Sequence, residues 1–163
     1  MSWVLPLVLW FFVAAWWFLA DGWLAAAAGI YRPDLGVAFC LFAVFAARPG
    51  ALPWLVSCAG LGRALVFGGA PALHVLQLGA PVALLFPLRR LALPPAFLHL
   101  AAAGLLAVLL PVLSWLLPAG GDPLPHAALP SLPALLCGMV ATPLAAALLG
   151  RLPPLWFFRE HRR

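Results

Sequence analysis

Four stretches of this chain run for 18 to 31 residues without a single Asp, Glu, Lys or Arg: residues 3–20, 64–88, 91–121 and 123–150. About 20 apolar residues in a helix are enough to cross the hydrocarbon core of a bilayer. Hydrophobic residues make up 66% of the chain, whereas soluble domains contain roughly 45–50%. We therefore expect an all-α, polytopic integral membrane protein, with residues 1–163 forming a single transmembrane bundle, rather than a soluble, disulfide-rich or disordered chain.

Proline and glycine divide the apolar sequence into helices. Arg48-Pro49-Gly50 predicts a turn, Gly68-Gly69-Ala70-Pro71 ends one helix and starts the next, and residues 118–125 have the composition of a loop. Six transmembrane helices result, over residues 3–28, 33–47, 52–67, 72–88, 94–117 and 129–150. A five-span alternative fuses the second and third helices and carries Arg48 through the hydrocarbon, which costs about 2.5–3.5 kcal/mol.

The arginines indicate how the bundle is oriented, because short cytoplasmic loops are enriched in Lys and Arg. An even number of spans places both termini on one side. That side holds most of the basic residues: Arg48, Arg89, Arg90, Arg151, Arg159, Arg162 and Arg163. The opposite side has only Arg32, while Arg63 lies within the third helix. The bias predicts cytoplasmic N- and C-termini (N-in/C-in), with residues 151–163 as a basic interfacial tail that contacts anionic lipid or a cytosolic partner. No basic cluster precedes this tail, so a nucleic-acid partner is not expected.

The second and third predicted helices are short. At 1.5 Å per residue they extend about 22 and 24 Å, less than the roughly 30 Å of hydrocarbon, so their ends need cover from other helices. We expect them to form a hairpin wrapped by the longer helices, with irregular backbone between Gly60 and Leu73.

Signal-peptide cleavage near residues 25–29 is an alternative for the N-terminus, although a basic start is missing. The tryptophans of the first apolar run are expected to face lipid or its interfaces: Trp3, Trp10, Trp16, Trp17 and Trp23.

Small residues recur at every fourth position of the last predicted helix. Helices associate in lipid through close backbone approach at small side chains. This pattern predicts a packing stripe formed by Gly138, Thr142, Ala146 and Gly150. Ala103 and Ala107 repeat the pattern over a shorter length in the fifth helix. The alternative is that the alanines reflect only a biased composition.

Arg63 is the most informative polar residue, because a guanidinium within a membrane needs a partner or a polar cavity and marks a functional candidate. Its candidate partners are Asp21, Asp34 and free carbonyls near Gly68-Gly69. The alternative is that its side chain extends to the interface without a specific partner. Asp34 follows Pro33 and is expected to cap a helix that starts there. Asp21 is expected either to break the first helix or to be a buried partner of an arginine.

The residues do not form a recognisable catalytic, cofactor or metal motif. Cys40, Cys58 and Cys137 lie in three separate apolar runs, so we interpret them as small buried hydrophobic residues. His74 and His99 are expected to be hydrogen-bonded packing residues. Asp122 and His126 have the spacing of a metal site in principle, but we do not expect one there. The sequence therefore predicts a protein without enzymatic activity, metal or cofactor.

Two neighbouring stretches resemble the MreD family of rod-shape-determining membrane proteins. One is Tyr31-Arg32-Pro33-Asp34-Leu35, which opens a short apolar helix that ends in Ala47-Arg48-Pro49; the family has a similar R-P-D-L start and basic turn. The other is Gly60-Leu61-Gly62-Arg63-Ala64-Leu65, followed by Gly68-Gly69 and, after Pro71, Leu73-His74. The resemblance covers about residues 31 to 90. This chain departs from the family at Ala64, where the family has an acid, so the role of that acid does not carry over.

The resemblance implies a non-catalytic component of the cell-elongation (rod) complex in the bacterial inner membrane, involved in cell shape and peptidoglycan synthesis. Its partners would be an MreC-like protein, the MreB filament and the peptidoglycan polymerase and transpeptidase pair. The family also implies a fold similar to the substrate-binding S component of energy-coupling-factor transporters, which supplies the alternative function of a small-molecule-binding membrane subunit. That alternative requires a cavity with several polar groups. A third possibility, a membrane enzyme, requires Asp21, Asp34 and Arg63 to meet at one pocket.

Overall fold

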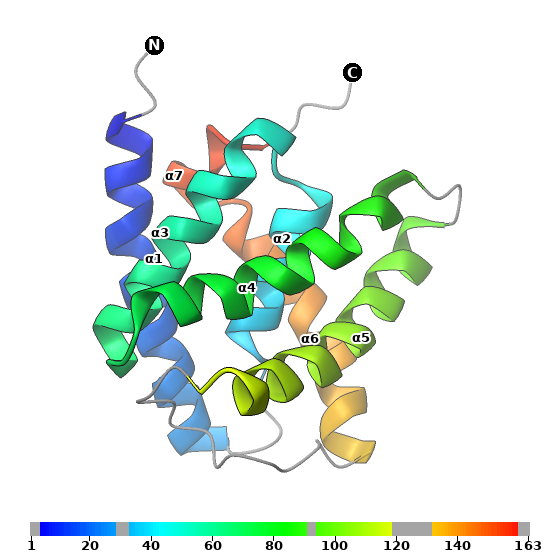
Figure 1. The fold of residues 1–163 in the computed structure, drawn as a ribbon. Helices are drawn as coiled ribbons and strands as arrows, with labels where there is room; N and C mark the ends of the chain where they lie inside the picture. Colours follow the sequence, from blue (N-terminus) through cyan, green and yellow to red (C-terminus); the bar gives the residue numbers. More distant parts are fainter. Residues whose placement is uncertain (1–3, 29–32, 91–93, 119–131, 160–163) are drawn as a thin grey trace.

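The computed structural model describes residues 4–28, 33–90, 94–118 and 132–159, and these residues are largely helical (Figure 1). The main helices are α1 (Val4–Ala28), α2 (Leu35–Phe45), α3 (Leu52–Phe67), α4 (Pro71–Leu85), α5 (Pro95–Leu116) and α6 (Leu132–Leu149). Three short helical segments are η2 (Pro49–Ala51), η3 (Phe86–Arg90) and α7 (Pro153–Trp156). The all-α fold, the six predicted helices and the breaks at residues 48–50 and 68–70 are confirmed.

Four helical segments are long and apolar enough to cross a membrane: residues 4–28, 49–67, 71–90 and 96–116. Helix α2 and the part of α6 from Leu136 to Leu149 are apolar but shorter. Successive helices run in alternating directions, so the start of α1 and the short helix α7 lie at the same end of the bundle (Figure 1). We call this the arginine end, because the segments that follow α2, α4, α6 and α7 there carry Arg48, Arg89, Arg90, Arg151 and Arg159.

Helix α2 lies at the centre of the bundle, and every residue from Leu35 to Val44 is buried. It packs against α1, α4, α5 and α6 and barely touches α3. The predicted hairpin of the second and third helices is therefore wrong, since α3 lies at the periphery with Trp54, Leu61 and Leu65 exposed. The physical reason is that α2 is apolar on every side, and such a helix is stable only when it is enclosed on every side.

Glycines bring α3 close to both of its neighbours. A Cβ atom added at Gly60 would lie 2.7 Å from the backbone nitrogen of Val75 on α4. One added at Gly62 would lie 2.9 Å from the backbone nitrogen of Ala15 on α1. These distances are shorter than real Cβ contacts, so only glycine permits this approach. Accordingly, α1–α3 and α3–α4 are the most extensive helix pairs of the described bundle.

The irregular backbone predicted between Gly60 and Leu73 is confined to residues 68–70. Helix α3 continues to Phe67, because Gly68 is the first residue that leaves the helical conformation, as glycine commonly does at the end of a helix. Gly68 and Gly69 then adopt φ angles of 76° and 87°, a region that glycine enters without steric cost. Pro71 begins α4, as expected for proline at a first helical position.

The small residues of α6 pack over part of their length. Thr142 and Ala146 are buried, and a Cβ added at Gly150 would lie 3.3 Å from the ring of Phe42 on α2. A Cβ at Gly138 would meet no atom within 4 Å. The stripe therefore contributes to the bundle from Thr142 onward, and Gly138 lies at an open position.

The tryptophans of α1 divide between the two faces of the helix. Trp16 and Trp23 are 71% and 74% exposed, as expected for lipid-facing residues. Trp10 is fully buried, where its ring stacks on Phe39 at 5.7 Å and its Nε1 donates to the carbonyl of Leu55 at 3.0 Å. The expectation is wrong for Trp10 because α1 turns this face toward α3, and a buried indole N–H finds an acceptor there. Trp3 lies outside the described residues.

Residues 155–159, at the end of the last described segment, pack onto the turn between α2 and α3. The backbone nitrogen of Arg48 donates to the carbonyl of Phe158 at 2.8 Å, and Ala47 pairs with Arg159 in an isolated antiparallel bridge. Leu155 and Phe158 are buried by this contact, whereas Trp156 and Phe157 remain exposed. The predicted interfacial tail is therefore partly buried in the bundle between residues 155 and 158.

Substitution of Gly60 by alanine is expected to destabilise the protein by about 1–3 kcal/mol, because the added methyl group meets backbone atoms of α4 that cannot move aside. Gly138→Ala is the matched control. Its methyl group enters open space, so the change is expected to be neutral or slightly stabilising. Reversible unfolding in detergent compares the two variants. Equal destabilisation of both would contradict the assigned α3–α4 contact.

Candidate functional site

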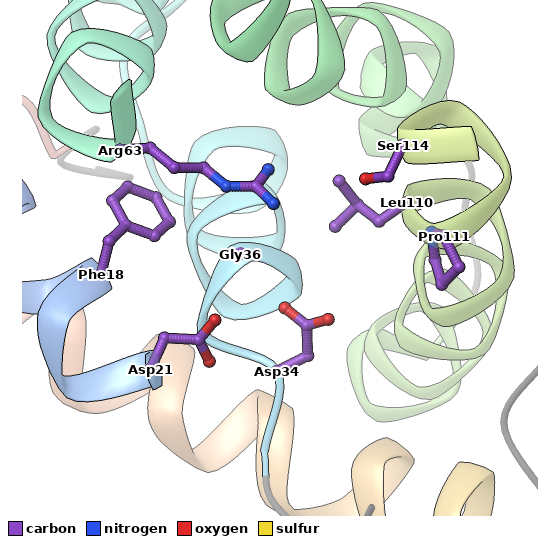
Figure 2. Close-up of a pocket in the computed structure, with 8 residues that line it drawn as sticks. All are labelled: Phe18, Asp21, Asp34, Gly36, Arg63, Leu110, Pro111 and Ser114. Atoms are coloured by element: carbon purple, nitrogen blue, oxygen red, sulfur yellow. The ribbon is translucent and has the colours of Figure 1, made fainter. Parts of the chain in front are cut away.

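Charged side chains from three elements meet in a small cavity at the end of the bundle opposite the arginine end (Figure 2). Asp21 comes from α1, Asp34 from the residue before α2, and Arg63 from α3. The cavity has a volume of about 20 Å³ and is lined by Phe18, Asp21, Asp34, Gly36, Arg63, Leu110, Pro111 and Ser114. Asp21 and Asp34 were both candidate partners of Arg63, and the fold brings all three residues to one cavity.

The two acids bind the first turn of α2. Oδ1 of Asp34 accepts the backbone N–H of Val37 at 3.0 Å, and Oδ1 of Asp21 accepts the N–H of Leu35 at 3.2 Å. Carboxylates at a helix start satisfy free N–H groups and face the positive end of the helix dipole. The predicted capping role of Asp34 is confirmed. However, Asp34 itself is the N-cap, so Pro33 precedes the cap rather than occupying the first helical position.

Asp21 does not break the first helix, since α1 continues to Ala28 and the carboxyl group is buried. A single acid does not end a helix whose other residues remain apolar and packed. Asp21 instead faces the cavity that also holds Arg63 (Figure 2). Of the two expectations for this residue, burial near an arginine is therefore the one observed.

Arg63 points into the bundle instead of extending to the surface. Its side chain is only 7% exposed. Nη1 donates to Oε1 of Gln77 at 3.2 Å, and the guanidinium lies 6.0 Å from the ring centre of Phe18 and 5.9 Å from that of Phe67. These distances permit cation–π attraction. The guanidinium therefore contacts α1 and α4 and also lines the cavity that holds the two acids. Of its candidate carbonyl partners, that of Gly68 lies 2.8 Å from Nε2 of His74.

Gln77 is a residue of the site that the sequence reasoning missed. Besides accepting from Arg63, it donates through Nε2 to the carbonyl of Leu117 at 2.7 Å, at the end of α5. One side chain on α4 thus connects α3 with α5. The signal was present, because Gln77 is the only amide side chain in the chain, and an amide inside an apolar helix needs internal partners.

His74 closes the turn between α3 and α4. Its Nε2 lies 2.8 Å from the carbonyl oxygen of Gly68, and its Nδ1 is buried without a hydrogen-bond partner. His99 packs its ring against Phe45 at 4.4 Å. The packing roles predicted for both histidines agree with these contacts, although His74 uses only one of its two nitrogens.

The cysteines are not equally buried. Cys40 is buried in α2, Cys58 is half-buried and Cys137 is exposed. The prediction of a small buried residue is therefore wrong for Cys137, because this side of α6 faces outward. Within residues 4–28, 33–90, 94–118 and 132–159, there is no group of three His, Cys, Asp or Glu side chains arranged for a metal ion.

Several sequence candidates lie apart from the cavity or outside the described residues. Arg48 is at the arginine end, and Gly68 and Gly69 shape the α3–α4 turn. Ala64 is buried in α3, directly after Arg63. Arg32, Asp122 and His126 belong to the residues that the structure does not describe.

The size of the cavity limits what the charged cluster can bind. Sites for small organic ligands measure roughly 300–1,000 Å³, whereas about 20 Å³ is room for one water molecule. Both acids also accept hydrogen bonds from the α2 backbone. The arrangement can therefore balance charge and join four helices, and it has no room for an organic substrate.

Comparison with models of known protein families, with curated proteins and with solved structures gives no match. What the chain does is therefore inferred from its own residues and their geometry.

Replacement of Arg63 by methionine is expected to destabilise the protein by about 3 kcal/mol, because the buried carboxyl group of Asp21 and the partly buried one of Asp34 lose the opposite charge that shares their cavity. Asp21→Asn removes one of those charges and keeps an acceptor for Leu35. The double variant should lose clearly less stability than the sum of the single variants. Arg90→Met, which changes an exposed arginine, is the control and should stay within about 0.5 kcal/mol of the unsubstituted protein. Strictly additive losses for Arg63→Met and Asp21→Asn would show that the two side chains are not coupled.

Proposed function

We propose that this chain is an integral protein of the bacterial inner membrane, with six spans and both termini in the cytoplasm. The exposed surface supports this, because large apolar side chains cover it. On α6, for example, Val140, Leu144 and Leu148 recur every fourth residue and are 61–64% exposed. Soluble monomers rarely expose such continuous apolar surface, whereas lipid accepts it.

Exposed aromatic residues occur near both ends of the bundle. Trp54, Trp156 and Phe157 lie at the arginine end, and Trp23 and Trp115 lie near the ends of α1 and α5 at the opposite side. Tryptophan and tyrosine are enriched at the two membrane–water interfaces, and exposed Phe157 extends the first group. Two such belts flanking an apolar surface support a transmembrane position, and the arginines support a cytoplasmic arginine end.

Within the membrane, we propose a non-catalytic scaffold or regulatory role in the cell-elongation complex, which acts in cell shape and peptidoglycan synthesis. The proposed partners are an MreC-like protein and the cell-wall elongation proteins. The observation that carries this proposal is the small volume of the charged cavity. The two acids that line it accept hydrogen bonds from the start of α2, so these charged groups hold helices together. A scaffold needs a filled core and an apolar surface for partners. Two stretches resemble the MreD family. The described part of the first, Pro33-Asp34-Leu35, opens the central helix α2, and the second, from Gly60 to His74, contributes to the α3–α4 contact.

A specific observation favours the alternative of a small-molecule-binding subunit, namely the convergence of Asp21, Asp34 and Arg63 on one cavity. Its volume argues against this alternative, because a ligand of vitamin size needs more than ten times the space. The third possibility, a membrane enzyme, also required this convergence. It is disfavoured because both acids are engaged by the start of α2 and have capping roles.

Affinity purification of the tagged, full-length chain in mild detergent tests the proposal. We expect an MreC-like protein and peptidoglycan synthases to be recovered with it, and to be absent from a purification of an unrelated six-span protein with the same tag. Recovery of a transporter ATPase module in their place would refute the scaffold role and favour the ligand-binding alternative.

A further inference from the structure

We propose that the charged cavity binds one water molecule, which links Ser114 on α5 to Asp34 and Arg63. Asp34 caps the start of α2, and Arg63 lies on α3. The water therefore joins α5 to the elements that meet at the start of the central helix. The site lies in the interior of the bundle, so it does not depend on the proposed membrane partners.

The cavity has both the size and the lining that a bound water requires. A buried water needs a space of at least about 10–15 Å³ and two to four polar partners. The volume of about 20 Å³ exceeds this minimum. Cavities that stay empty are lined by apolar groups, whereas four residues around this one have polar side chains: Asp21, Asp34, Arg63 and Ser114.

The side chains that face this space complement the hydrogen-bonding pattern of water. Figure 2 shows the guanidinium of Arg63, the carboxyl group of Asp34 and the hydroxyl of Ser114 pointing toward the same space. A guanidinium only donates, a carboxylate only accepts, and a hydroxyl does both. One water molecule can accept from Arg63, donate to Asp34 and bond to Ser114, so a single molecule matches all three groups.

The other contacts of Asp34 and Ser114 are compatible with a bound water. Oδ1 of Asp34 accepts the backbone N–H of Val37, and a carboxylate has a second oxygen that also accepts. A serine hydroxyl has one donor and two acceptor positions. It can therefore bond to a water even where it also donates to a carbonyl within its own helix.

The water lies next to a weak point of α5. Pro111 lies inside this helix and lines the same cavity. A proline within a helix removes one backbone hydrogen bond and weakens the helix at that position, so the last turn of α5 depends more on contacts with other helices. Gln77 provides one such contact at the carbonyl of Leu117. Ser114 provides a second one through the water, between Pro111 and the end of the helix.

A crystal structure of the full-length chain, at a resolution that shows ordered water, tests the site directly. We expect one density peak at about 2.5–3.2 Å from a guanidinium nitrogen of Arg63, a carboxyl oxygen of Asp34 and the Ser114 hydroxyl. A cavity without density would overturn the proposal. So would a direct hydrogen bond between Ser114 and either charged group.

Ser114→Ala removes the contact of α5 with the water. Ser57→Ala is the matched control, because it makes the same change at another partly buried serine, on α3 and outside the cavity. Loss of one hydrogen bond in Ser114→Ala is expected to lower the Tm by about 3 °C, whereas Ser57→Ala should keep the Tm within about 1 °C. Equal changes of Tm in the two variants would contradict the link between α5 and the water.

Thermal unfolding in sodium chloride and in choline chloride at equal concentrations separates water from a small cation. A bound water predicts the same Tm in both salts. A higher Tm in sodium chloride would assign a sodium ion to the cavity, since a bound ion stabilises the folded protein, and would overturn the proposal. Partner recovery is a separate readout, so the water site and the scaffold role fail independently.

Discussion

The enclosure of α2 is the constraint on which the rest of this structure depends. Helix α2 is apolar on every side, so it is stable only when other helices cover it completely. It has only eleven residues, so both of its ends lie inside the molecule or at its edge. Backbone groups at helix ends need partners, and where they are buried the partners must come from other parts of the chain. The polar side chains of this protein supply those partners.

The backbone groups at the two ends of α2 form hydrogen bonds with different types of side chain. At its start, the carboxyl groups of Asp21 and Asp34 accept backbone N–H groups, and Arg63 faces the same cavity. Beyond its last turn, Arg89 donates to the carbonyl of Ala47. The signs follow the helix dipole, with anions at the positive end and a cation beyond the negative end. Among the described residues, both acids lie near the start of α2 together with Arg63, whereas the arginine end carries Arg48, Arg89, Arg90, Arg151 and Arg159.

The helices and turns could be predicted from the sequence because they depend on local features. Helices begin and end where the uninterrupted apolar runs are broken by turn residues, as at Pro49-Gly50 and Gly68-Gly69. These breaks do not depend on which other helices pack nearby. The capping role of Asp34 is also local, since its partner is three residues away. What could not be predicted depends on packing between distant segments. Trp10 and Trp16 belong to the same helix and the same residue type, and only the position of α3 decides which one is buried. The role of Gln77 likewise depends on where Leu117 ends α5, and the separation of α2 from α3 depends on the helices that enclose α2.

The three native cysteines allow the enclosure of α2 to be measured without any substitution. Cys40 lies in the buried α2, Cys58 is half-buried on α3, and Cys137 is exposed on α6. In the folded, detergent-solubilised protein, a membrane-permeant maleimide should label Cys137 first and Cys58 more slowly. Cys40 should remain unlabelled until the protein is unfolded, as mass spectrometry of the peptides would reveal. Labelling of Cys40 at the rate of Cys137 in the folded protein would contradict a central, enclosed α2.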